Sequence, residues 1–342
     1  MNYGDTQIIY STHSTHISEV SNVRNINILG KHGARCEAYQ PSTGLNEVEV
    51  GNIQRYLDAV RSNLLFAKSV ILVEGDAEEL LIPVLIKKVL GISLDELGIS
   101  LVNVRSTGFQ NVAVLFHDSR IRKKCAILTD LDAAFIDTTP NDLDAEGTKK
   151  FKLECAASQA SGVSRKTILE QFSNGNPWIK LSFAPHTFEV DFISAGNKET
   201  VVSVLGDVYK TEAKIAEAKA ELESGDIAQY GKRVLTIARQ EGKGWFAIRL
   251  GKAVGHNAVI PPYILDAIFF THPTFTREMW FNVLSYRLDC IEKGGQIGAE
   301  EITQFRARLA AYRSQALDFI SIRGEMLGAF PADQINAILS RF

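Results

Sequence analysis

Cysteine is sparse in this sequence of 342 residues, and no two cysteines form a CxxC pair. The four lie far apart, at Cys36, Cys125, Cys155 and Cys290. This spacing argues against a zinc ribbon and against a disulfide framework. It suits a reducing compartment, so we expect a cytoplasmic protein.

Long apolar runs and a strong excess of one charge are also absent. No apolar stretch reaches the roughly 18–20 residues that a membrane helix needs, and no signal peptide is visible at the N-terminus. The net charge of −3 excludes a uniformly basic nucleic-acid-binding surface but leaves room for a local basic groove. With 45% apolar and 23% charged residues, the composition is typical of a soluble globular protein.

Apolar runs alternate with helical patterns between residues 69 and 195. The predicted strands are residues 70–74, 99–104, 125–130 and 178–185. The predicted helices between them are residues 79–90, 109–119 and 164–172, the last with Ser164 as its N-cap. This pattern predicts an α/β fold with a mostly parallel sheet that is covered by helices on both faces.

The flanking segments have a different character. Towards the N-terminus we expect short strands at 5–12 and 24–29, separated by a helical turn. A polar connector at 31–52 and a helix at 52–67 should follow. After residue 196 the sequence is rich in Ala, Glu and Lys with helical spacing. We therefore predict three regions: an N-terminal segment 1–66, a catalytic α/β domain 67–195 and an α-helical domain 196–342.

A carboxylate directly follows the first predicted strand of the sheet. Glu74 ends the run VILVE, Gly75 permits a tight turn, and Glu78 falls in the first turn of the next helix. In open α/β sheets, functional sites form where the loops at the carboxyl ends of the strands converge. We expect Glu78 to face back toward Glu74 at this edge.

Two further strand ends carry pairs of carboxylates. Asp130 and Asp132 close the run CAILTDLD, and Glu189 and Asp191 follow the last strand with the same spacing. Extended backbone places residues i and i+2 on one side, so each pair should project together. Clustered carboxylates raise one another's pKa unless a cation neutralises them. Two Mg²⁺ ions held by such oxygen ligands would clamp the attacking and leaving oxygens of a phosphodiester.

A single acid at a strand-to-helix turn is more often a helix cap than a ligand. We therefore expect a structural role for Asp76 and Glu79. For Glu74, Asp130 and Asp132 we expect a functional role, because these acids follow apolar strands at the same edge of the sheet.

The motif VEGDAE, followed further along the chain by DLD, resembles a Toprim domain. That domain is the catalytic module of type IA and II topoisomerases, primases and several nucleases. The resemblance covers roughly residues 67–195 and implies a Rossmann-like, mostly parallel sheet flanked by helices. The triplet Ser106, Thr107 and Gly108, after the second strand, also suits such a sheet.

The N-terminal segment IIYSTHSTHISEV resembles the switch-histidine segment of an ABC-type ATPase, with His13 as the switch histidine. An ATPase followed by a Toprim domain resembles the OLD (overcoming lysogenisation defect) nucleases of bacteria and phages. TFEVD and GKGWFA are similar to further motifs of that family. The resemblance implies phosphate stabilisation by Lys243, a part in phage defence, and two Mg²⁺ ions, replaceable for binding by Mn²⁺ or Ca²⁺. The implied metal ligands are Glu74, Glu78, Asp130, Asp132, Glu189 and Asp191.

The sequence departs from that family because it has no GxxxxGK[ST] phosphate loop and no Walker B strand ahead of His13. We therefore expect the chain to be the C-terminal part of a longer protein. It should bind no ATP itself, and His13 should be a surface or packing residue. Any homodimer is expected to form in the full-length protein.

The leading hypothesis is metal-dependent cleavage of DNA, with Glu74, Asp130 and Lys243 as the catalytic residues. We expect the protein to contact mainly the DNA backbone. Residues 120–124 are poor candidates, since they lie at the start of the strand that ends at Asp130. The better basic candidates are Lys210, Lys232, Arg233, Arg239, Lys243 and Arg249. Two alternatives stay open: a non-catalytic Toprim module for DNA binding or oligomerisation, and a topoisomerase-type or primase-type enzyme.

Overall fold

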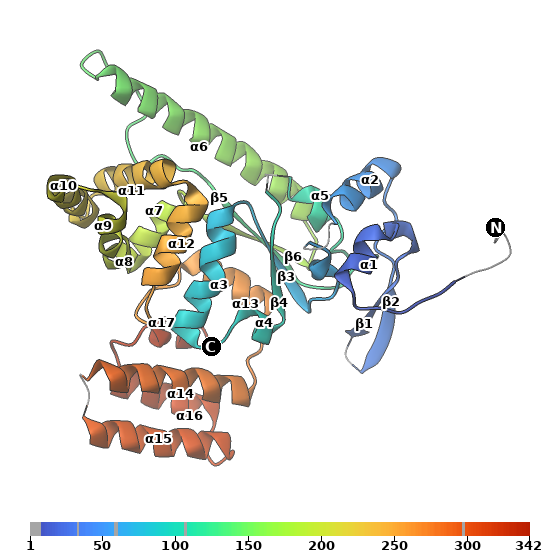
Figure 1. Ribbon diagram of the computed structural model, residues 1–342. Helices are drawn as coiled ribbons and strands as arrows, with labels where there is room; N and C mark the ends of the chain where they lie inside the picture. The colour runs from blue at the N-terminus through green and yellow to red at the C-terminus, as the bar shows by residue number, and fades with distance from the viewer. Residues whose placement is uncertain (1–7, 33, 58–60, 106–107, 296–297) are drawn as a thin grey trace.

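A four-stranded parallel sheet lies at the centre of the molecule, in the strand order β4-β3-β5-β6 (Figure 1). The structure is a computed structural model that describes residues 8–32, 34–57, 61–105, 108–295 and 298–342. The strands are β3 (Ser69–Val73), β4 (Ile99–Asn103), β5 (Cys125–Asp130) and β6 (Ile179–Ala184). All neighbouring pairs are parallel, so the four carboxyl ends meet at one edge, and the predicted α/β fold is confirmed.

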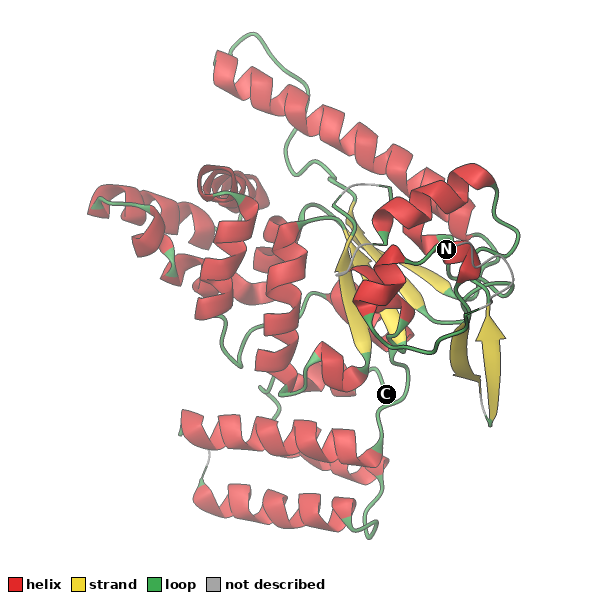
Figure 2. Cartoon of the chain, turned by 45° about the vertical axis from the view of Figure 1, so that its right-hand side comes forward, coloured by secondary structure: helices red, strands yellow, loops and turns green. Residues whose placement is uncertain are grey.

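Helices surround this sheet (Figures 1 and 2). The helices that cover it directly or through another helix are α2 (Glu47–Tyr56), α3 (Asp76–Leu90), α4 (Leu94–Leu97), α5 (Gln110–Ala113), α6 (Glu146–Ser173), α12 (Lys243–Ala253) and α13 (Pro262–Thr271). The other α-helices are α1 (Thr15–Val20), α7 (Phe188–Phe192), α8 (Lys198–Ser203), α9 (Leu205–Val208), α10 (Glu212–Glu223), α11 (Ile227–Glu241), α14 (Arg277–Gly294), α15 (Ala299–Arg313), α16 (Phe319–Ala329) and α17 (Ile335–Leu339). Short helical turns are the 3₁₀ helices η1 (Val23–Asn25) and η2 (Arg61–Leu65) and the π-helix η3 (Ile193–Asn197).

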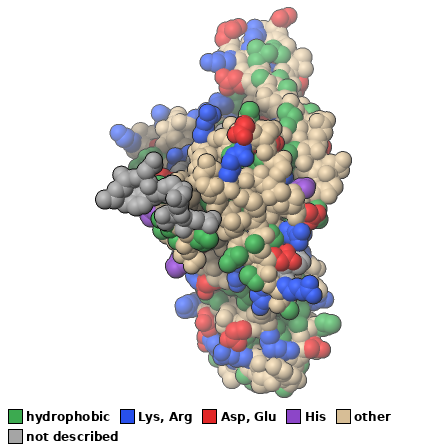
Figure 3. Space-filling view, turned by 90° about the vertical axis from the view of Figure 1, so that its right-hand side faces the viewer, with side chains coloured by type: hydrophobic (Ala, Val, Ile, Leu, Met, Phe, Trp, Pro, Cys, Tyr) green, Lys and Arg blue, Asp and Glu red, His purple; other side chains and the backbone are tan. Residues whose placement is uncertain are grey.

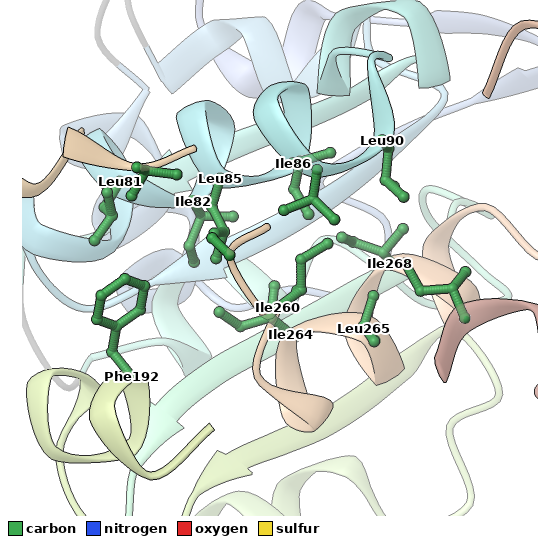
Figure 4. Close-up of a cluster of buried hydrophobic side chains, with 14 of the residues drawn as sticks. Leu81, Ile82, Leu85, Ile86, Leu90, Phe192, Ile260, Ile264, Leu265 and Ile268 are labelled. Carbon is green, nitrogen blue, oxygen red and sulfur yellow. The ribbon is translucent and has the colours of Figure 1, made fainter. Parts of the chain in front are cut away.

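Strand β3 is buried along its whole length because both faces of the sheet are covered. Val70 and Leu72 lie in the core on the side of α2 and α5. Ile71 and Val73 lie in the core on the opposite side, with α3 and α13. Figure 4 shows this second core, where apolar side chains of α3 meet those of α13. Two covered faces explain why the run is continuously apolar instead of alternating.

The helices that follow residue 196 are not separate from the sheet. Helix α13 packs on β3, β5 and β6, and α12 packs along α3. Helices α14, α15 and α16 form an outlying layer (Figure 1). The buried Arg287 of α14 ties this layer to the end of α3, because it donates hydrogen bonds to the Val89 carbonyl and to the Asp333 carboxylate. The helical character of this half agrees with the prediction, whereas the boundary at 195/196 stays a prediction.

The N-terminal predictions are partly wrong. Residues 8–12 form no strand, and residues 5–7 of that prediction lie outside the described residues. The expected connector contains strand β2 (Arg35–Tyr39), which pairs antiparallel with β1 (Ile28–His32). The start of α2 also falls in this connector, and α2 ends at Tyr56 instead of running on to the sheet. These short, half-exposed elements bury few side chains, so they carry little periodic signal.

Two predicted helices have other lengths. Ser164 is not an N-cap, because α6 begins at Glu146 and runs to Ser173. Its buried residues are only Gly162 and Leu169, so most of the helix lacks the apolar stripe that reveals a helix in a sequence. The helix predicted over 109–119 is reduced to the short α5.

Charge is interspersed over the face of the molecule that Figure 3 shows. On the face turned to the viewer in Figure 3, Lys and Arg side chains lie among Asp and Glu side chains, without a broad field of one sign. Among the described residues, no helix combines the length and the apolar character that crossing a membrane would require.

Candidate metal centre

Glu74 lies at the carboxyl end of β3, where it bridges to the neighbouring strand. Its Oε2 accepts a hydrogen bond of 2.9 Å from the hydroxyl of Thr129 in β5. Gly75 follows with φ −136° and ψ 171°, which is extended backbone open to any residue. A Cβ atom there would lie 3.0 Å from Oε2 of Glu78, so a larger residue would require a small shift of that carboxylate. The tight turn therefore brings Glu78 back beside the strand end, as its sequence position suggested.

Glu78 is buried in the first turn of α3, with 8% of its surface exposed. Its pKa is raised to about 7, chiefly by burial; the nearby carboxylates of Glu189 and Glu74 contribute to the rise, whereas its own backbone N–H and Lys243 oppose it. A cation that binds near neutral pH would displace the proton of such a carboxyl group into solvent.

Asp130 ends β5 and lies among the other acids. Its Oδ2 accepts a hydrogen bond of 3.3 Å from the backbone N–H of Phe188, the first residue of α7. Withdrawal from water raises the pKa of Asp130 well above its usual range, and the charges of Glu78 and Glu189 add to the effect. The carboxyl end of the sheet thus brings acids from three elements together.

Asp132 does not continue the extended backbone of β5. Its φ of 51° is left-handed, and its N–H donates to the His186 carbonyl at 3.0 Å. The expectation that Asp130 and Asp132 project together from extended chain is therefore wrong in its geometry. The carboxylate of Asp132 is instead held by Arg165 of α6, whose Nη2 lies 2.7 Å from Oδ2.

Glu189 and Asp191 lie in the short helix α7 and not in extended chain. Residues two apart on a helix point to different sides, so the two carboxylates have different surroundings. Glu189 forms an ion pair of 3.5 Å with Lys243, and neither of its buried carboxylate oxygens has a hydrogen-bond partner among the described residues. Asp191 accepts a hydrogen bond of 2.8 Å from the His186 N–H, and burial raises its pKa to about 6. Asp191 thus closes the turn ahead of α7.

Lys243 is the first residue of α12 and follows Gly242, whose φ of 82° is left-handed. Its side chain is 57% exposed, so the ammonium group reaches solvent as well as Glu189. Partial burial acts to lower its pKa, but the carboxylates of Glu189, Asp130 and Glu78 outweigh this effect and raise it. Lys243 is therefore a charged group at the rim of the acidic cluster.

Two residues at this site could not be identified from any pattern in the sequence. Arg165 projects from the polar helix α6 onto Asp132. Its Nη1 also lies 3.7 Å from Oε2 of Glu74. Tyr263 of α13 has a buried hydroxyl without a hydrogen-bond partner, and burial followed by the charges of Asp130 and Glu78 raises its pKa well above the usual range.

Other sequence candidates have structural partners. The amide of Asn103, at the end of β4, donates to the carboxylates of Asp76 and Glu79 at 2.9 Å each, which agrees with the structural role expected of these two acids. His13 is exposed, and Ser106 and Thr107 lie outside the described residues.

The basic side chains fall into two groups: some are bound within the protein, and others line a hollow. Residues 120–124 lie just before β5, at the end of the strand opposite the acids. Their side chains donate mainly to backbone carbonyls. Arg233 is bound to Glu217 and Glu221, and Arg249 to Glu241. Lys232 and Arg239 line a hollow of about 320 Å³ between α6 and α11. Arg239 lies 3.4 Å from Glu154 there, and both basic residues remain candidates for ligand contact because they face this open space.

The donor set of the cluster suits a hard divalent cation. In the described part of the chain, the carboxylates of Glu74, Glu78, Asp130, Asp132 and Glu189 gather here, and the cations that act on them are Arg165 and Lys243. Within the described parts of the chain, no three potential ligands converge closely enough, as they stand, to hold an ion. The raised pKa values and the unbonded oxygens of Glu189 nevertheless mark a site with too little positive charge, which a bound cation would correct.

An open hollow of about 790 Å³ adjoins the acids. It is lined by Glu74 and Lys243 and also by Arg105 and Trp245, and the Trp245 side chain is 67% exposed. Carboxylates, cations and an aromatic ring therefore face one space.

Part of the chain is similar to known proteins. Residues 65–132 match the family model described as "Overcoming lysogenization defect protein-like, TOPRIM domain". The chain is similar to the C-terminal region of the Burkholderia pseudomallei OLD protein (26% identity, 61% of this chain and 98% of that chain, TM-score 0.44). It is also similar to that of the Xanthomonas campestris pv. campestris OLD protein (24% identity, 62% and 95%, TM-score 0.43). The curated proteins give no match. Residues 65–132 thus form a Toprim domain of the OLD-like family.

Proposed function

We propose that the protein is a metal-dependent endonuclease that hydrolyses phosphodiester bonds of DNA. The observation that carries this proposal is the group of under-neutralised carboxylates at the carboxyl edge of an OLD-like Toprim sheet. The ordinary role of such an edge in α/β folds is to hold a ligand, and the excess of negative charge selects a cation as the first ligand.

The cation would draw its ligands from the clustered carboxylates of Glu74, Glu78, Asp130, Asp132 and Glu189. When bound, a divalent cation supplies Lewis-acid activation of water and neutralises charge on the phosphate. Asp191 contributes by closing the turn that aims Glu189, and Thr129 fixes the orientation of Glu74. These contacts place the carboxylates before a ligand arrives, which lowers the cost of assembling the site.

Lys243 supplies the protein's own positive charge at the phosphate. Its side chain is more than half exposed, at the rim of the cluster, and three carboxylates raise its pKa, so the ammonium group stays protonated. A cation that is fixed where negative charge develops stabilises the transition state of phosphodiester cleavage.

DNA would enter through the hollow beside the acids. Arg105 and Lys243 offer charges to phosphates, and Trp245 offers an exposed ring on which an unpaired base can stack. The hollow lined by Lys150, Lys232 and Arg239 gives a further place for backbone contact. Contacts of this kind read the backbone, so binding should weaken steeply with salt.

Nicking of supercoiled plasmid with Mg²⁺ or Mn²⁺, compared with the same reaction in a chelator, tests the proposal. Glu74→Gln and Asp130→Asn should each lower the rate at least about a hundredfold, since even the residues that merely support metal ligands contribute 10–100-fold. Glu79→Gln is the matched control, because it alters an acid of the same helical turn that bonds Asn103 instead.

Three other outcomes would reject the proposal. Full activity of Glu74→Gln and Asp130→Asn would exclude these acids from catalysis. DNA binding without metal-dependent nicking would identify a binding module. A covalent protein–DNA adduct trapped by denaturant would identify topoisomerase-type chemistry through a tyrosine.

A further inference from the structure

The acidic cluster is not evenly neutralised. Glu74 and Asp132 share Arg165, at 3.7 and 2.7 Å. Among the described residues, the cation that acts on the carboxylates of Glu78, Asp130 and Glu189 is Lys243, whose side chain is more than half exposed. One half of the cluster therefore contains a largely buried cation, Arg165, whereas the other half has an exposed cation at its rim.

Arg165 is fixed in its place and is not a mobile surface residue. Its side chain is only 12% exposed, and Nη2 also donates to the backbone carbonyl of Asp130 at 2.5 Å. Its planar guanidinium thus contacts the backbone of one acid and the carboxylates of two others. An arginine held by several acceptors keeps its charge and its orientation.

Helix α6 reaches the site only through an unusually close approach. A Cβ atom on Gly162 would lie 1.9 Å from the Leu131 carbonyl oxygen, so only glycine lets the helix lie against this loop. Gln159, one turn earlier, accepts a hydrogen bond of 2.7 Å from the Ala134 N–H. Arg165 is one turn later on the same side of the helix, because residues three and four apart are neighbours on a helix surface. These contacts clamp α6 onto the loop that carries Asp132.

We propose that Arg165 takes the place of a second metal ion, so that the centre binds a single divalent cation on the side of Glu78, Asp130 and Glu189. This inference rests on the proposed metal-dependent function and makes it specific. A second cation at Asp132 would lie beside the guanidinium and would have to displace it from both carboxylates. The repulsion between the two positive charges opposes that exchange.

The number of bound Mn²⁺ ions tests the proposal without any measurement of activity. Titration of the protein with Mn²⁺, followed by the electron paramagnetic resonance signal of free Mn²⁺, gives the stoichiometry directly. The wild-type protein should bind one ion. Arg165→Met removes the charge at similar side-chain length and should bind two, with a second-site affinity at least about tenfold above that of the wild type. Arg165→Lys keeps the charge and should bind one.

Lys166→Met is the matched control, because it removes the neighbouring positive charge, which is 44% exposed and faces Glu170. It should bind one ion, as the wild type does. Thermal melting in chelator establishes that each variant is folded, and Arg165→Gln replaces Arg165→Met should that protein fail to fold. Two ions of similar affinity in the wild type, or one ion in Arg165→Met, would overturn the proposal. A wild-type protein that binds no ion would reject the metal-dependent function itself.

Discussion

Replacing Gly162 by alanine tests whether the close contact between α6 and the loop after β5 is needed for the fold of the site. The added Cβ atom would lie 1.9 Å from the carbonyl oxygen of Leu131 and 2.6 Å from its carbonyl carbon. Real Cβ atoms essentially never approach within 3.0 Å, so the helix or the loop must move by about 1 Å. Both obstructing atoms belong to the backbone and cannot rotate away as a side chain could.

Two opposing effects set the size of the change in stability. Alanine favours a helix over glycine by about 1 kcal/mol. Overpacking costs about 1–3 kcal/mol, and a backbone contact this short belongs at the upper end of that range. The free energy of unfolding should therefore fall by about 2 kcal/mol in Gly162→Ala. Gly147 is the control in the same helix, since a Cβ atom there meets nothing within 4 Å. Gly147→Ala should raise the free energy of unfolding by up to about 1 kcal/mol.

Urea unfolding, followed by circular dichroism, measures both variants under the same conditions. The two should differ by about 3 kcal/mol, with Gly162→Ala the less stable. Because α6 carries Arg165, the same substitution should also loosen the contact with Asp132 and raise the affinity for a second Mn²⁺ ion. If Gly162→Ala proves as stable as Gly147→Ala, the close approach is not a constraint and the reasoning fails.

Three further predictions concern charge and substrate contact. Glu189→Gln removes a buried and poorly neutralised carboxylate, so it should raise the melting temperature in chelator. The same substitution should reduce the stabilisation that Mg²⁺ provides. Unchanged melting temperatures in both conditions would contradict this prediction. The pKa of Glu78 rises from 4.5 to about 7 on folding, so the folded state binds more protons, and metal-free stability should fall as the pH rises from about 4.5 to 7. Urea midpoints in chelator measure this slope, and Glu78→Gln should flatten it. Trp245→Ala should weaken binding of a single-stranded oligonucleotide in Ca²⁺ by about 1–3 kcal/mol, measured by fluorescence anisotropy, while Trp245→Phe retains most of it; equal affinity of all three proteins would exclude stacking.

Part of the candidate site follows from local sequence rules. Glu74 and Asp130 end buried parallel strands, and such strand ends converge at one edge, so their proximity could be predicted. Glu78 could be placed beside Glu74 from the length of a turn. The spacing of Asp130 and Asp132 and of Glu189 and Asp191 was misleading, because extended geometry was assumed where the chain turns or becomes helical. Two residues of a pair at i and i+2 then have different surroundings and different roles.

The helical regions show the same limit. The covered helix α3 has buried residues at regular spacing, and its prediction is confirmed. Helix α6 is mostly exposed, and neither its start nor its contact with the site could be read from an apolar period. The sequence predicts α13 only as part of a helical half, although this helix packs on β3, β5 and β6.

By itself, the amino-acid sequence determined the central parallel sheet, the acids at its carboxyl edge and the helical character of the second half. Each depends on patterns within one segment, which burial on both faces or on one stripe imposes. The tertiary structure alone decided which charges balance those acids. Arg165 and Lys243 reach them from helices that are far away in the sequence, and the close approach of α6 at Gly162 sets the position of Arg165. Electrostatic partnership depends on distances of a few ångströms between such segments, and no local pattern records those distances.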